Sequence, residues 1–119
     1  MKILFASADR DLLSTYEKIL KIRGCDVYTV FDGAQVMNTD HTGTSVAVID
    51  EKLPRVPCGK LIKFFGDKGI PVIVLTYKNG CGEKSAKSLP FPFTPNDLTE
   101  IIDGLCQSGK NGQDGETDE

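Results

Sequence analysis

The sequence has no apolar run near the roughly 20 residues that a transmembrane helix requires. Its apolar opening, residues 1–6, is followed by Asp9 and Arg10, which come too early for the apolar stretch of a secretory signal. We therefore expect neither a membrane protein nor an exported one, and predict a cytoplasmic location. At 119 residues and 13.0 kDa, the chain suits one compact domain.

A strong excess of charge of either sign is also absent. The formal net charge is −3, and the four acids and one Lys of residues 108–119 sum to that value. Residues 1–107 therefore carry no net charge. A domain without net charge has no overall attraction for phosphate backbones, which argues against nucleic-acid binding. Because residues 108–119 hold no large apolar side chain, we predict a domain over 1–107 and a disordered acidic tail over 108–119.

Metal-ligating side chains are few. The four cysteines include no Cys-x-x-Cys pair, and His41 is the only histidine. This pattern disfavours a zinc site, and without an export signal we expect reduced thiols. Cys81 is the cysteine that we expect to be exposed, and His41, within the polar loop 39–44, is predicted to be solvated.

Apolar and β-branched runs alternate with segments of helical spacing. Helices are predicted after Asp9, after the Asp32-Gly33 turn, from Cys58 and after Thr94, where Thr94 and Asp97 have the spacing of a capping box. The predicted strands are 3–6, 27–31, 46–49 and 70–77, with a short proline-interrupted segment at 89–93. The apolar faces are Leu12, Tyr16, Ile19 and Leu20 in the first helix, Leu61, Ile62 and Phe65 in the third, and Leu98, Ile101, Ile102 and Leu105 in the last.

Strands that alternate with helices predict a parallel sheet with right-handed crossovers. These strands are apolar on both faces, which is typical of a sheet covered by helices on both sides. In such sheets the functional crevice lies at the carboxyl ends of the strands. Residues 7–9, 50–51 and 76–77 follow or end three of the predicted strands, so we expect the site there.

The segments around these strand ends resemble those of a known family. Their order and spacing are similar to the receiver domain of bacterial two-component response regulators, the CheY-like family. The resemblance implies an α/β, flavodoxin-like, doubly wound sheet of five parallel strands in the order 2-1-3-4-5, with the fourth helix shortened or missing. The matching segments are Lys2 to Ala6, Gly24, Asp32-Gly33, Val48-Ile49-Asp50-x-x-Leu53-Pro54, Pro71 to Thr76 and Phe91-Pro92-Phe93-Thr94-Pro95.

By this resemblance, Asp50 stands at the phosphoacceptor position and Thr76 at the position of the switch hydroxyl. Other positions depart from the family pattern. The acidic pair that helps to bind Mg²⁺ falls on Ser7 and Ala8. Ser88 falls at the position of the switch aromatic, and Phe91 falls at the position of the conserved Lys. The Phe91–Pro92 bond corresponds to a bond that is cis in the family, so we predict that the bond before Pro92 is cis.

Loss of two acids and a Lys removes both the metal platform and the fixed cation. We therefore expect a degenerate pseudo-receiver without enzymatic activity or a cofactor, in which Mg²⁺ binds weakly or not at all. Its partner would be a protein in signal transduction, such as a histidine kinase or an output protein. Two alternatives remain open: an atypical but active Asp50 phosphoacceptor, and a small-molecule-binding module that uses the Gly-rich segment 79–82.

Overall fold

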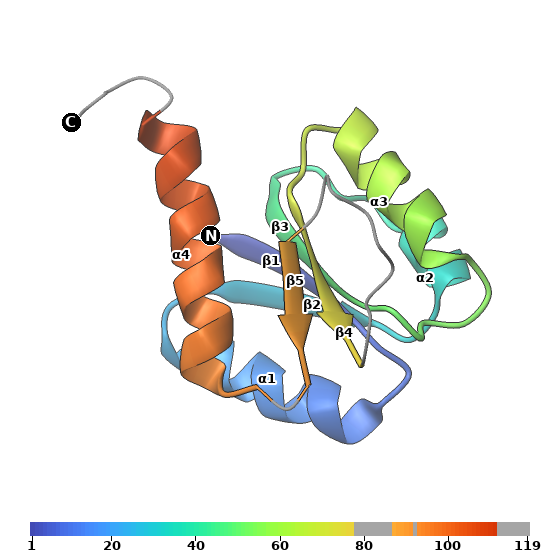
Figure 1. The fold of residues 1–119 in the computed structure, drawn as a ribbon, viewed down its shortest axis with the longest axis horizontal. Helices are drawn as coiled ribbons and strands as arrows, with labels where there is room; N and C mark the ends of the chain where they lie inside the picture. The colour runs from blue at the N-terminus through green and yellow to red at the C-terminus, as the bar shows by residue number, and fades with distance from the viewer. Residues whose placement is uncertain (78–86, 92, 112–119) are drawn as a thin grey trace.

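The protein, in a computed structural model, is described for residues 1–77, 87–91 and 93–111, and within 106–111 only for the course of the helix. Five strands form one sheet in the order β2-β1-β3-β4-β5, and every neighbouring pair is parallel (Figure 1). The predicted strand order is confirmed. The strands are β1 (Lys2–Ala6), β2 (Asp26–Val30), β3 (Thr44–Asp50), β4 (Val72–Thr76) and β5 (Lys87–Pro90).

Helices cover both faces of the sheet. In Figure 1, α1 and α4 lie on one side of the strands, and α2 and α3 lie on the other. Each pair of helices packs over its own cluster of buried side chains. The predicted doubly wound arrangement is therefore confirmed. The helices are α1 (Arg10–Ile22), α2 (Gly33–Asn38), α3 (Cys58–Asp67) and α4 (Pro95–Asn111).

The helix ends follow the local sequence. Asp9 caps α1, where its Oδ1 accepts a hydrogen bond from the Leu12 N–H at 3.1 Å. Gly24, just past the end of α1, has φ 90, a conformation that favours glycine. Thr94 and Asp97 form the predicted capping box at the start of α4, each side chain accepting from the other's backbone N–H.

The buried face of α1 is rotated slightly from the predicted one. Leu13, Tyr16 and Leu20 are its buried residues, whereas Leu12 and Ile19 are only partly buried. Leu13 was absent from the predicted face. Because helical residues lie about 100° apart, Leu13 and Leu20 share the side on which Tyr16 lies, and Leu12 and Ile19 flank it.

The connection between β4 and β5 is short. Thr76 ends β4 and Lys87 begins β5, so that residues 77–86 form the whole link, and Tyr77, its described residue, is not helical. The shortening of the family's fourth helix is confirmed. Cys81, the segment 79–82 and Pro92 lie outside the described residues, so the predictions made for them stay predictions.

The last helix continues past the predicted domain boundary. The helical backbone of α4 runs to Asn111, and not only to residue 107. Extending an existing helix is far easier than starting one, which accounts for a helix that enters a polar segment. The rest of the predicted tail, 112–119, lies outside the described residues. Within the described part of the chain, no helix combines the length and the apolar character needed to cross a membrane.

His41 is buried, and the prediction of a solvated histidine is wrong. Its side chain is 5% exposed, and its Nε2 lies 2.7 Å from the carbonyl oxygen of Val36. Its Nδ1 contacts the hydroxyl of Tyr28, and its ring lies edge-on against Phe65. The polar sequence around His41 concealed this position, because an imidazole can pack its carbon atoms against rings while both nitrogens find hydrogen-bond partners.

Candidate functional site

Three strand ends meet at the carboxyl edge of the sheet. Asp50 ends β3 and Thr76 ends β4, while Ser7 follows β1 directly. In the strand register Ala6 lies beside Ile49, and Asp50 lies beside Leu75. The structure thus brings these residues together at the predicted edge. Asp50, Thr76 and Ser7 are all buried, with exposed fractions of 4%, 3% and 0%.

The Asp50 carboxylate accepts three hydrogen bonds in the described part of the chain. Its Oδ2 accepts from the Ser7 hydroxyl at 2.9 Å and from the Tyr77 hydroxyl at 3.0 Å. Its Oδ1 accepts from the Lys52 backbone N–H at 2.9 Å. A carboxylate offers about four lone-pair sites, so most of the acceptor capacity of Asp50 is already used.

Ser7 links the ends of two strands to the start of a helix. While its hydroxyl donates to Asp50, its Oγ also accepts from the Asp9 N–H at 3.0 Å. Asp9 in turn caps α1. The neighbouring Ala8 is exposed, and its methyl group offers no ligand atom. A neutral hydroxyl therefore lies beside Asp50 at one of the two positions where the resemblance places acids.

Tyr77 provides the second hydroxyl, and its ring is held by two neighbours. The ring stacks on that of Phe91, with centroids 4.7 Å apart and an interplanar angle of 25°. The Lys52 Nζ lies 4.0 Å from the centroid of the same ring. Burial, followed by the hydrogen bond and the negative charge of Asp50, raises the pKa of Tyr77 to about 12. The phenol therefore remains a neutral donor at ordinary pH.

Phe91, at the position where the resemblance places a Lys, carries no charge. Its ring stacks on Tyr77, and its ring centroid also lies 4.9 Å from the ring centroid of Phe93. Its backbone N–H donates to the carbonyl oxygen of Thr76 at 2.8 Å, which continues the alignment of β4 and β5. Ser88, at the position of the switch aromatic, is exposed on β5 and pairs with Val74.

Comparison with known proteins shows which proteins the chain is similar to. No protein-family model matches the chain. The receiver domain of the Francisella response regulator 1452 is 26% identical, with a TM-score of 0.77, over 91% of this chain and 98% of that one. Protein PilG of Pseudomonas aeruginosa is 27% identical over 114 residues, which cover 86% of this chain and 84% of PilG. The chain is a receiver-like domain.

The same fold occurs in other solved structures. A response regulator receiver domain from Clostridium thermocellum has a TM-score of 0.78 at 22% identity, over 92% of this chain and 96% of that one. The chemotaxis response regulator CheY4 of Vibrio cholerae has a TM-score of 0.75 at 20% identity, over 87% of this chain and 97% of that one. At these identities the likeness concerns the architecture alone.

Two further acids follow strand ends near Asp50 in the receiver-like domain. Asp9 and Glu51, which are neighbours of Ser7 and Asp50 in the sequence, each accept a backbone hydrogen bond. Asp9 accepts from Leu12 at the start of α1, and Glu51 accepts from the Tyr77 N–H at the end of β4. Across residues 1–77, 87–91 and 93–105, no cluster of three or more His, Cys, Asp or Glu side chains could hold a metal ion.

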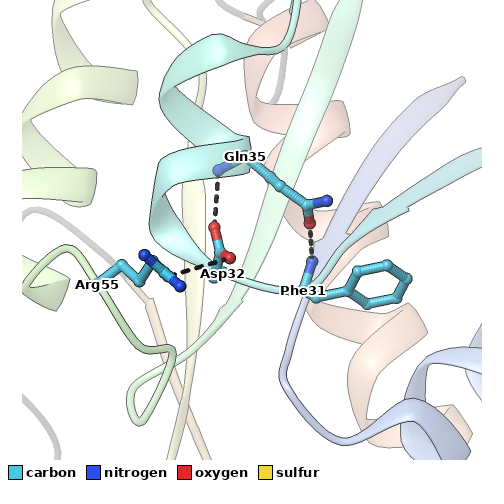
Figure 2. A network of polar contacts seen from close by, with 4 residues as sticks. All are labelled: Phe31, Asp32, Gln35 and Arg55. Carbon is cyan, nitrogen blue, oxygen red and sulfur yellow. Dashed lines mark hydrogen bonds and ion pairs between the residues drawn. The ribbon is translucent and has the colours of Figure 1, made fainter.

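At the same edge of the sheet, polar contacts link the end of β2, the start of α2 and the β3–α3 loop (Figure 2). Asp32 caps α2 by accepting from the Gln35 N–H at 2.8 Å, and the Gln35 side chain accepts from the Phe31 N–H. The Arg55 Nε lies 3.5 Å from Asp32 Oδ2, which ties the β3–α3 loop to the start of α2. Phe31 stays 37% exposed beside Arg10.

Tyr77 is the site residue that sequence reasoning missed. Its position at the end of the predicted fourth strand placed it at the correct edge, but we assigned it no role. A signal was available, because a tyrosine combines a large ring with a hydroxyl, and Phe91 could serve as its stacking partner. The sequence separation of Tyr77, Phe91 and Asp50 concealed their contact.

Proposed function

We propose that this receiver-like domain signals by protein contact and does not depend on phosphorylation of Asp50. The observation that supports this proposal is the set of hydrogen bonds on the Asp50 carboxylate from Ser7, Tyr77 and the Lys52 backbone. These donors stabilise the unmodified carboxylate and occupy space next to both of its oxygens. A phosphoacceptor needs an oxygen that an incoming phosphoryl group can reach. We further propose that the domain acts in the cytoplasm and has no enzymatic activity of its own.

The charges around Asp50 support the same proposal. Phosphoryl transfer is catalysed mainly by positioning and by stabilisation of charge. Mg²⁺ requires oxygen ligands in near-octahedral geometry, commonly from one or two carboxylates together with phosphate and water. Ser7, Ala8 and Phe91 supply neither a second carboxylate nor a fixed cation at the expected positions. We therefore propose that the site binds Mg²⁺ weakly or not at all.

Treatment with acetyl phosphate, or with beryllofluoride, in the presence of Mg²⁺ tests the proposal. The expected result is no adduct on Asp50 by intact-protein mass spectrometry and no change in the amide NMR shifts of Ser7, Asp50 and Thr76. The matched control is Asp50→Asn, which should give the same spectra after treatment as before. A stoichiometric adduct in the natural protein that disappears in Asp50→Asn would establish the alternative.

That alternative is an atypical but active phosphoacceptor. It is supported by the pairing of β3 with β4, which sets Asp50 beside Leu75 and brings it near Thr76. The same strand ends would carry the nucleophile and the switch hydroxyl in an active receiver. The adduct experiment separates the two functions because only the active form needs a reachable Asp50 oxygen.

We propose that the contact surface for a histidine kinase or an output protein includes α4 and β5. A hollow of about 330 Å³ lies between these elements, with a partly buried apolar floor and charged side chains at its edge. Apolar side chains beside charged ones are common at protein interfaces. Its lining residues are Lys87, Glu100, Ile101, Gly104 and Leu105.

A further inference from the structure

Building on the proposed function, we propose that Tyr77 is an internal latch that occupies the pocket at Asp50, and that Phe91 is the positioning residue that holds it closed. On this proposal, Phe91 at the position of the family's Lys has a structural role in holding Tyr77. It provides a ring that stacks on Tyr77 in place of a cation that would contact a phosphoryl group.

The first step of the argument is the geometry at Asp50 Oδ2. The Tyr77 hydroxyl lies 3.0 Å from this oxygen, and the Ser7 hydroxyl lies 2.9 Å from it. A hydrogen-bonded oxygen at this distance occupies space that an atom approaching the carboxylate would need. Because Asp50 is 4% exposed, the phenol covers a carboxylate that has little other contact with solvent.

The second step is the anchoring of the Tyr77 ring. From Tyr77, rings follow one another through Phe91, Phe93 and Tyr16 to the fully buried Phe5, with centroid separations of 4.7, 4.9, 5.4 and 5.7 Å. Aromatic pairs at such distances attract one another beyond the area that they bury. The latch is therefore connected to the core beneath α1 through side chains in contact.

The third step concerns the other contacts of Tyr77. Its backbone N–H donates to Glu51, the residue that follows the phosphoacceptor position. The Lys52 Nζ lies 4.0 Å from its ring centroid, a distance typical of cation–π attraction. Two residues that follow β3 directly thus hold the backbone and the ring of Tyr77, and the hydroxyl is directed at Asp50.

The test measures how readily the Asp50 carboxyl reacts. The folded protein is treated with a water-soluble carbodiimide and glycinamide, and labelling of each carboxyl is followed by peptide mass spectrometry. In Tyr77→Ala and Phe91→Ala, we expect Asp50 to be labelled at least about tenfold faster, the equivalent of about 1.4 kcal/mol of protection. Asp67, a highly exposed carboxylate on α3, is the internal reference and should react at an unchanged rate.

Tyr77→Phe is the second variant, and it keeps the ring while removing the hydroxyl. We expect the carboxyl ¹³C resonance of Asp50 to shift in Tyr77→Phe, while the remaining resonances keep their positions. This readout reports the hydrogen bond directly and does not depend on whether the alanine variants fold. Phe91→Tyr should preserve the stacking and keep Asp50 as slow to react as in the natural protein.

The outcomes separate the latch from the proposed function. Unchanged Asp50 labelling in both alanine variants, or an unchanged Asp50 resonance in Tyr77→Phe, would overturn the latch while leaving contact-based signalling in place. An Asp50 adduct formed by the natural protein with beryllofluoride and Mg²⁺ would instead overturn the proposed function, whatever the labelling rates are.

Discussion

At the scale of single residues, the side chains that donate hydrogen bonds to Asp50 in the described part of the chain are two neutral hydroxyl groups. Ser7 and Tyr77 both donate to Asp50 Oδ2. Hydrogen bonds from neutral donors to a buried carboxylate compensate for its lost hydration. They do not bring the positive charge that phosphoryl transfer requires. The chemistry of the pocket is therefore that of a stabilised anion.

The ionisation of Tyr77 gives a pH-dependent prediction. Its pKa is raised from 10.0 to about 12, first by burial and then by Asp50. Because the folded pKa lies above the unfolded one, the neutral phenol stabilises the fold fully below the unfolded pKa, and this stabilisation is lost as pH rises through the folded pKa. Urea unfolding from neutral to alkaline pH should show a shallower loss of stability in Tyr77→Phe than in the natural protein.

Two other tyrosines set the control for this measurement. Burial also raises the pKa values of Tyr16 and Tyr28, so the Tyr77→Phe variant should retain part of the alkaline loss. Tyr28→Phe removes a tyrosine that is distant from Asp50 in the sheet and serves as the matched variant. Identical alkaline profiles for Tyr77→Phe and the natural protein would contradict the raised pKa of Tyr77.

Ser7 and Ala8 are neighbours with opposite expected sensitivities. Ser7→Ala leaves the buried Asp50 carboxylate with one donor fewer, so we expect a loss of about 1–3 kcal/mol in the free energy of unfolding. Ala8 is exposed, so Ala8→Ser should change that free energy by less than about 0.5 kcal/mol. Urea denaturation of both variants tests the difference, and equal effects would show that the Ser7 hydroxyl is not needed by Asp50.

At the scale of helices and strands, the sequence predicted most of the elements that position the site residues. Local signals predicted these elements, namely the apolar run before Asp50 and the capping residues Asp9 and Thr94. Such signals depend only on residues that are close together in the sequence, so a single sequence is enough to recognise them. The burial of His41 and the stacking of Tyr77 on Phe91 are not local. They depend on side chains that meet only when the sheet and its loops assemble, so the periodicity of one segment does not reveal them.

The start of α2 depends on close packing against the β3–α3 loop. Gly33 donates its N–H to the carbonyl oxygen of Pro54 at 2.8 Å, and a Cβ built on Gly33 would lie 2.5 Å from the Val56 Cβ. Gly33→Ala should therefore destabilise the protein by about 1–3 kcal/mol. In thermal denaturation this substitution should lower the melting temperature.

Gly66 is the matched control for this prediction. It lies within α3, where an added Cβ would meet no atom within 4 Å. Gly66→Ala should therefore stabilise the helix, by up to about 1 kcal/mol. A Gly33→Ala protein as stable as the natural one would mean that the loop carrying Val56 can move away without cost.

At the scale of the whole molecule, the sheet and its two helical layers are held together mainly by buried apolar side chains, and the polar groups of the site lie at the edge of the sheet. The buried clusters on the two faces comprise apolar side chains from β1, β3 and β4, and the site residues follow where those strands end. Topology therefore predicts where a pocket forms, and the residues in it determine what the pocket does. This separation explains why the receiver fold was predictable from one sequence while the role of Tyr77 was not.

The same separation predicts that substitutions at the strand ends can change the chemistry of the site without refolding the protein. We expect the combination of Ser7→Asp, Ala8→Asp and Phe91→Lys to react only weakly with beryllofluoride and Mg²⁺, because Tyr77 still donates to Asp50 but has lost the ring that stacks on it. Adding Tyr77→Ala should open the pocket fully, because the phenol no longer occupies Asp50 Oδ2 and this oxygen can bind Mg²⁺ together with the two new acids.

Adduct formation on Asp50, measured by mass spectrometry and ¹⁹F NMR, distinguishes the triple variant from the quadruple one. Asp50→Asn in the quadruple background is the control and should abolish any adduct. If the triple variant reacts as well as the quadruple one, Tyr77 does not obstruct Asp50. The missing acids and the missing Lys would then be the reason that the natural protein forms no adduct. If a folded quadruple variant stays inert, receiver chemistry requires more than these positions, and the shortened link between β4 and β5 becomes the next difference to restore.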